Sequence, residues 1–125
     1  MRLLFVVNSP KSLRPTYTSS YLAAAAARRG HEVAFVSVDE LSHEREVTGR
    51  VIRLGVGDGA DPAALVAAIR RPKPQREPVS LAEFDVVLLR NNPHVGNGRT
   101  VHVNPAIELG RRLKSAGAMV WYVAG

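Results

Sequence analysis

The chain has 125 residues, of which 46% are hydrophobic and 22% charged, and it contains no cysteine. This length favours one domain around one core, and the composition is that of an ordinary globular protein. Without cysteine, the chain can form no disulfide, thiolate metal site or cysteine nucleophile. No apolar run approaches the length of a membrane-spanning helix. We therefore expect a cytoplasmic protein with no membrane partner.

The net charge of +6 invites a nucleic-acid partner. However, the basic residues are spread along the chain, and aromatic side chains, on which bases stack, make up only 6% of it. The densest basic cluster, residues 70–76, includes two prolines and is typical of a solvated connection. We therefore expect no nucleic-acid partner, and we assign the charge to an acidic partner domain or an anionic ligand.

The first third of the chain predicts a β-α-β unit. Residues 2–7 form a continuous apolar run, as in a parallel strand that is covered on both faces. The hydroxyl residues 18–20 are N-cap candidates for an alanine-rich helix that continues to Arg29, and Gly30 suits the left-handed position after it. Residues 32–38 form a second buried strand, and the unit should be parallel and right-handed.

The middle of the chain is less regular. Residues 46–54 predict a small β-hairpin with a glycine-containing turn. Asp61 followed by Pro62 is typical of an N-cap and first helical position, and this short helix should end before Pro72.

Two further strands complete the expected sheet. Residues 85–89 form the third, and a helix that begins at Asn104-Pro105 and ends at Gly117 leads to the fourth at residues 118–123. The sequence thus predicts a single α/β domain over residues 1–125, with a Rossmann-like open parallel sheet in the order 2-1-3-4, flanking helices and the hairpin as an insertion. A doubly wound domain normally continues beyond such a strand, so we expect one lobe of a larger protein.

Two strands of this sheet run into polar loops, one beginning at Asn8 and the other at Arg90. Open α/β sheets bind ligands outside the carboxyl ends of their strands, where the strand order reverses. A guanidinium can pair with a carboxylate or phosphate through two hydrogen bonds, and a helix start rich in hydroxyls favours anions. The substrate-binding candidates are therefore Asn8, Ser19, Arg90 and Asn92. Helix capping by Ser19 and binding of loop carbonyls by Arg90 are the alternatives.

Nothing in the sequence predicts a catalytic residue, a metal ligand or a cofactor-binding residue. The segment from Gly55 to Gly59 imitates a dinucleotide fingerprint, but it follows a hairpin instead of the first strand, so we interpret it as a flexible loop. His94 and His102 are too few for a metal site without neighbouring carboxylates. We expect no catalysis from these residues alone.

Several segments, in order along nearly the whole chain, resemble bacterial glutathione synthetase and the wider ATP-grasp ligases, in the N-terminal lobe called the pre-ATP-grasp domain. They are Val6-Val7-Asn8-Ser9-Pro10, Thr18-Ser19-Ser20, Ala27-Arg28-Arg29-Gly30-His31-Glu32-Val33, the stretch of residues 47–54, Leu81-Ala82-Glu83-Phe84-Asp85-Val86-Val87-Leu88-Leu89-Arg90, and Asn92-Pro93. The stretch from Asp85 to Pro93 is the most specific of these.

The resemblance implies a ligase that activates a carboxylate with ATP and Mg²⁺ for attack by an amine. It places the ATP and Mg²⁺ sites in a lobe beyond Gly125. The implied partners are that lobe and a peptide or amino-acid substrate, and the resemblance is also compatible with a homo-oligomer. In this scheme Arg90 holds a substrate carboxylate, while Asn8, Ser19 and Asn92 orient the substrate by hydrogen bonds.

The chain departs from the family pattern at Asn8, where an acidic residue is common, at Asn91-Asn92, which replaces a more charged pair, and after Val120. These departures leave the substrate open between a glutathione precursor such as γ-glutamylcysteine and another peptide or amino acid. Two other classes also stay open: the N-terminal half of a two-domain (GT-B-type) glycosyltransferase, whose usual paired glycines are absent after residue 7, and a non-catalytic Rossmann-like binding module.

Overall fold

The computed structural model describes residues 1–42, 46–55, 57–71, 77–89, 111, 113–114 and 119–122. For Trp121 and Tyr122 it describes the main chain alone. At its centre is a five-stranded sheet in the order β4-β2-β1-β6-β7. Its strands are β1 (Arg2–Val7), β2 (Glu32–Ser37), β4 (Ile52–Arg53), β6 (Val86–Leu89) and β7 (Met119–Tyr122). Strand β1 is parallel to β2 and β6, and β6 is parallel to β7. The predicted parallel order is confirmed for these four strands.

The sheet is mixed, however, because β4 joins the edge beside β2 in antiparallel orientation. The predicted hairpin over residues 46–54 is wrong. Strand β3 (Thr48–Gly49) pairs with β5 (Val79–Ser80) in a separate two-stranded sheet, while β4 pairs with β2. Val51, between β3 and β4, belongs to the core on one face of the main sheet, and Ile52 to the core on the other. An isolated hairpin is only marginally stable, so each short strand is better stabilised by a partner elsewhere.

Alternate residues of each central strand enter two different cores. Leu4 and Val6 of β1 belong to one cluster, and Phe5 and Val7 to the other. The rings of Phe5 and Phe35 stack with their centroids 5.1 Å apart. Because both faces are covered, these strands are apolar throughout instead of alternating with polar residues.

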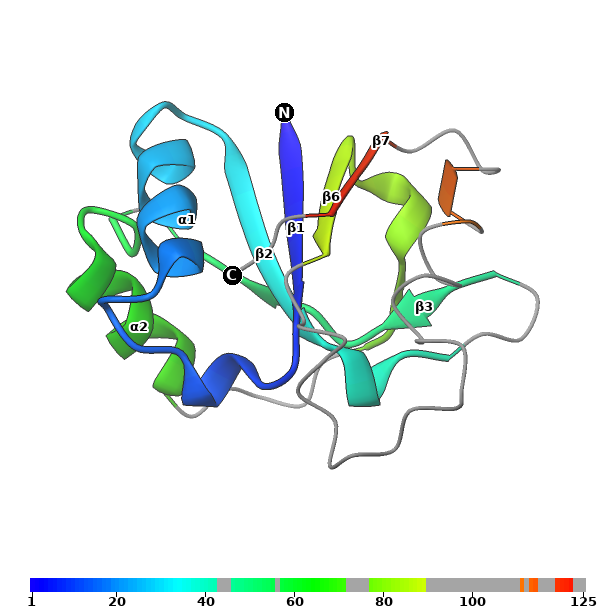
Figure 1. Cartoon of the computed structure of the whole chain (residues 1–125), viewed down its shortest axis with the longest axis horizontal. Coiled ribbons are helices and arrows are strands. Elements are labelled where there is room, and N and C mark those ends of the chain that lie inside the picture. The colour runs from blue at the N-terminus through cyan, green and yellow to red at the C-terminus, as the bar shows by residue number, and fades with distance from the viewer. Residues whose placement is uncertain are drawn as a thin grey trace.

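Two helices cover one face of the sheet, as Figure 1 shows. They are α1 (Thr18–Arg28) and α2 (Pro62–Arg70), and their buried residues join the core of Phe5 and Val7. The opposite face is covered by the 3-10 helix η3 (Leu81–Glu83) and by residues before β4, with Leu81 and Val47 in its core. No helix among the described residues is both long and apolar enough to cross a membrane.

The ends of both helices follow from local sequence, with one correction. Tyr17 is the N-cap of α1 and no side chain caps it, so the predicted caps at residues 18–20 lie inside the first turn. Helix α1 ends at Arg28, and Gly30 adopts the predicted left-handed conformation after it, with φ of +87°. The amides of Gly30 and His31 donate to the carbonyls of Ala27 and Ala26. This double hydrogen bond is a Schellman motif, which satisfies the last carbonyls of the helix.

The expected helix from Asn104 to Gly117 lies largely outside the described residues. Its described positions, Arg111, Leu113 and Lys114, are helical, and Leu113 is 2% exposed within the core that contains Leu4. This burial agrees with the inward face that the helical spacing predicts.

The start of α2 provides the first test of the fold. Asp61 Oδ1 accepts a hydrogen bond of 2.8 Å from the amide of Ala64, and Pro62 occupies the first turn. Asp61→Ala should lower the free energy of unfolding by about 1 kcal/mol, the usual value of an N-cap. Asp61→Asn, which keeps an acceptor oxygen, should cost much less. Urea denaturation measures both variants, and equal losses would show that the cap is not what stabilises this end.

Candidate functional site

The carboxyl ends of three strands meet at one edge of the sheet. Val6 of β1 is in register with Val36 of β2 on one side and with Leu89 of β6 on the other. Strand β1 therefore ends beside the last residue of β6, Leu89, at the same edge of the sheet. We call this the carboxyl edge, and the opposite end of the same strands the amino edge.

Asn8 follows β1 at the carboxyl edge and is exposed. Its carbonyl accepts a hydrogen bond of 2.9 Å from Ser37 Oγ, at the end of β2. The main chain of Asn8 is thereby tied to the neighbouring strand, and its side chain lies at the surface where a ligand could reach it. Ser37, which the sequence analysis did not select, is thus part of the site's framework.

Ser19 lies in the first turn of α1, but it is only 6% exposed and is engaged in a contact within the protein. The helix turns this position, together with Ser20 and Ala23, toward the interior. A hydroxyl in that position is better suited to supporting the site than to forming its open surface. Arg90 and Asn92 lie outside the described residues, so their roles as ligand-binding residues stay predictions.

The loop after β1, residues 8–17, is held in place from several elements. It contains the 3-10 helix η1 (Pro10–Ser12), and Leu13 after it is 5% exposed within the core. Ser20 donates to the carbonyl of Arg14, and Arg70 of α2 donates to two carbonyls of the same loop. The sequence analysis missed Arg70 in this role, because a basic residue at a helix end gives no signal of a contact 57 residues away.

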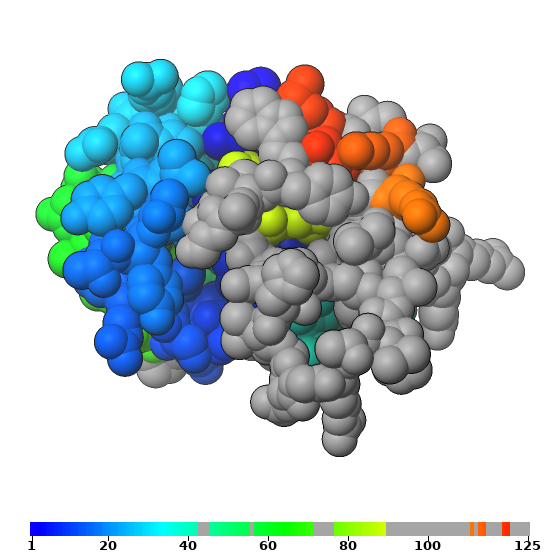
Figure 2. Space-filling model, viewed as in Figure 1, coloured from blue at the N-terminus to red at the C-terminus, as the bar shows by residue number. Residues whose placement is uncertain are grey.

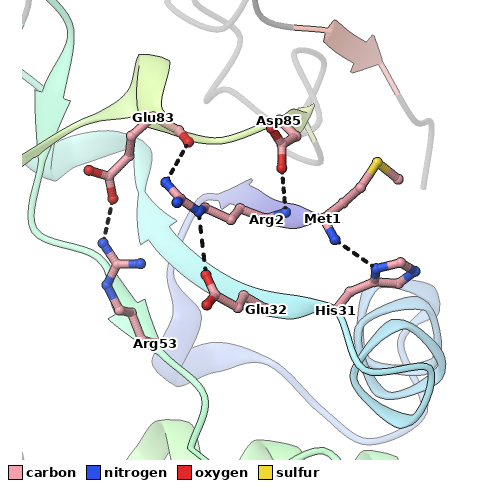
Figure 3. Close-up of polar contacts among 7 residues, drawn as sticks. All are labelled: Met1, Arg2, His31, Glu32, Arg53, Glu83 and Asp85. Atoms are coloured by element: carbon pink, nitrogen blue, oxygen red, sulfur yellow. Dashed lines mark hydrogen bonds and ion pairs between the residues drawn. The ribbon is translucent and has the colours of Figure 1, made fainter.

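Charged side chains at the amino edge pair with one another. At the amino edge, Figure 3 shows Arg2 beside Glu32 and Glu83, and Asp85 accepting from the Arg2 amide at 2.8 Å. Arg53 pairs with Glu83 and lies over the ring of Phe84. These charges are used within the protein.

At the carboxyl edge, charged side chains of both signs follow neighbouring strands. Lys11 and Arg14 follow β1, Asp39 and Glu40 follow β2 in the 3-10 helix η2 (Val38–Glu40), and all four are exposed. The first 31 residues, from Met1 to His31, contain no acidic side chain. This edge therefore has a basic side and an acidic side.

The described residues do not fit an ATP or Mg²⁺ site. They contain no group of three or more His, Cys, Asp or Glu residues placed to hold a metal ion. In the glycine-rich turn, Asp58 Oδ2 accepts from the amide of Gly55 at 2.7 Å, and Asp58 Oδ1 pairs with Arg71. A carboxylate that occupies the turn in this way opposes a phosphate there, so the turn is not a dinucleotide fingerprint.

The fold thus defines an α/β domain with a mixed, mostly parallel sheet, in which β1, β2 and β6 end together at the carboxyl edge. The sequence profile of the N-terminal domain of prokaryotic glutathione synthetase matches residues 1–105, and the chain belongs to this family. It is 34% identical over 97 residues to the glutathione synthetase of Gloeobacter violaceus, an alignment that covers 76% of this chain. The alignment spans 28% of that relative's length.

The glycine-rich turn provides a test of the packing at the end of α1. A Cβ added to Gly59 would approach the Cβ of Ala27 in α1 to 2.3 Å. Gly59→Ala should therefore lower the free energy of unfolding by about 1–3 kcal/mol, as overpacking does. Adding Ala27→Gly removes the clashing methyl, so the double variant should be more stable than the sum of the single effects by about 1 kcal/mol or more. Additive effects in chemical denaturation would contradict this close contact.

Proposed function

We propose that this chain is the N-terminal, pre-ATP-grasp lobe of an ATP-dependent carboxylate–amine ligase similar to glutathione synthetase. In this proposal its carboxyl edge forms one wall of the site for a γ-glutamylcysteine-like peptide or amino-acid acceptor. The observation that carries the proposal is the pairing of β1 with β6: two neighbouring parallel strands end in register, and a polar stretch of sequence follows each. Family membership supports the ligase over a glycosyltransferase or a binding module.

The charges at the carboxyl edge suit such an acceptor. A peptide or amino acid carries carboxylates and an ammonium group, and opposite charges attract more strongly where water is partly excluded. Lys11 and Arg14 offer the cationic side for the carboxylates, and Asp39 offers an anionic group for the ammonium group. A purely anionic ligand would use only half of this edge.

Within the proposed site, Arg90 holds an acceptor carboxylate, and Asn8, Ser19 and Asn92 orient the acceptor directly or through the site's framework. Orientation of a reactant can supply several kcal/mol of barrier lowering. ATP and Mg²⁺ supply the activation of the carboxylate, and they would be bound by the rest of the ligase. The proposed partners are therefore the small-molecule substrate and the remaining lobe, in a cytoplasmic enzyme.

Arg90 provides the main test, in the full-length ligase that contains this domain. Arg90→Ala should raise KM for the acceptor roughly ten- to a hundredfold, which corresponds to loss of a charge-assisted hydrogen bond worth about 1.5–3 kcal/mol. KM for ATP should stay nearly unchanged. Arg90→Lys should recover only part of the loss, because an ammonium lacks the planar fork of a guanidinium.

Arg29→Ala is the matched control, since Arg29 is exposed at the far end of α1 from the carboxyl edge. Steady-state kinetics with a dipeptide acceptor should leave this control unchanged. If Arg90→Ala bound the acceptor normally and lost only thermal stability, Arg90 would be a structural loop residue and the site assignment would fail.

A second test concerns the chain by itself. The purified 125-residue chain should hydrolyse no ATP, because its described residues provide neither a phosphate-binding turn nor a group of metal ligands. A coupled assay for ADP release measures this. ATP hydrolysis that co-purifies with the chain at constant specific activity would contradict the proposal that the other lobe binds ATP.

A further inference from the structure

We infer that Arg70 is a positioning residue for the acceptor: it holds the loop after β1 in the shape that the carboxyl edge needs. The inference rests on the proposed function, because this shape matters to binding only if the edge receives the acceptor. Arg70 is the last residue of α2, far in the sequence from the loop it contacts.

The guanidinium of Arg70 bridges two carbonyls of the loop. Nη2 donates to the carbonyl of Leu13 at 2.8 Å, and Nε donates to the carbonyl of Lys11 at 3.3 Å. Both carbonyls lie at the end of η1, where a helix leaves its last acceptors without partners. One planar fork with several donors satisfies both, and an ammonium cannot match that geometry.

Arg70 completes a set of anchors along the loop. Ser37 of β2 donates to the carbonyl of Asn8 at 2.9 Å, and Ser20 of α1 donates to the carbonyl of Arg14 at 2.7 Å. Between them Arg70 holds Lys11 and Leu13. Main-chain carbonyls at both ends and in the middle of the segment 8–14 are thus fixed from three separate elements.

The neighbouring Arg71 serves as a control, because its replacement removes the same positive charge from the end of α2 without removing the contact with the loop after β1. Arg71 is also exposed at the end of α2, but it pairs with Asp58 of the glycine-rich turn at 2.7 Å. Both arginines therefore hold a connecting segment by hydrogen bonds. Only the segment that Arg70 holds leads out of β1 at the carboxyl edge.

The first experiment uses steady-state kinetics of the full-length ligase. Arg70→Ala should raise KM for a dipeptide acceptor about five- to tenfold, because a small displacement of a binding wall weakens substrate positioning. Its kcat and its KM for ATP should stay within about twofold of wild type. Arg70→Lys should lie between the two, and Arg71→Ala should match wild type. Equal changes in Arg70→Ala and Arg71→Ala, or a loss of thermal stability without a change in acceptor KM, would overturn the inference.

The second experiment needs no activity and uses the intact protein. A lysine-specific endoproteinase should cleave after Lys11 several times faster in Arg70→Ala than in wild type or Arg71→Ala, because cleavage requires local opening of the loop. Unchanged cleavage would overturn the inference even in an active enzyme. Absence of ligase activity in the wild-type protein, with faster cleavage in Arg70→Ala, would instead overturn the proposed function and leave the loop anchor standing.

Discussion

The burial of β1 on both faces and both edges is the constraint on which the rest of the structure depends. It pairs with β2 on one side and β6 on the other, and its successive side chains enter two different cores. A shift of one residue would exchange every side chain between those cores, so the register of the sheet is strongly determined. That register makes β1, β2 and β6 end together, and it brings Asn8 to the carboxyl edge.

The two ends of this sheet are organised differently. At the amino edge the ion pairs of Arg2 and Arg53 satisfy the local charges. Such exposed pairs add little stability. At the carboxyl edge the charges stand on separate loops, and the hydrogen bonds there run mainly from side chains to carbonyls. These hydrogen bonds hold the main chain of the loop after β1, while Lys11, Arg14 and Asp39 are exposed.

Helix α2 connects segments that are distant in the sequence. Figure 2 shows α1 and the loop before it, coloured blue, forming one continuous side of the molecule, and α2 packs against α1 in Figure 1. At the end of α2, Arg70 reaches the loop after β1 and Arg71 reaches Asp58. At the other end of α1, Gly59 of the glycine-rich turn leaves no space for a Cβ beside Ala27. A helix that the sequence marks as ordinary scaffold therefore shapes the candidate site.

The sequence by itself determined the features that depend on neighbouring residues: the apolar runs of the strands, the cap at Asp61 and the left-handed Gly30. It also carried the family pattern, which the profile over residues 1–105 confirms. Only the tertiary structure separated β3 from β4, turned Ser19 inward and joined Arg70 to the loop after β1. These outcomes depend on which distant segment offers a better partner than the adjacent one. Short strands have little preference of their own for one partner over another, so the packing of the whole domain decides which segments pair.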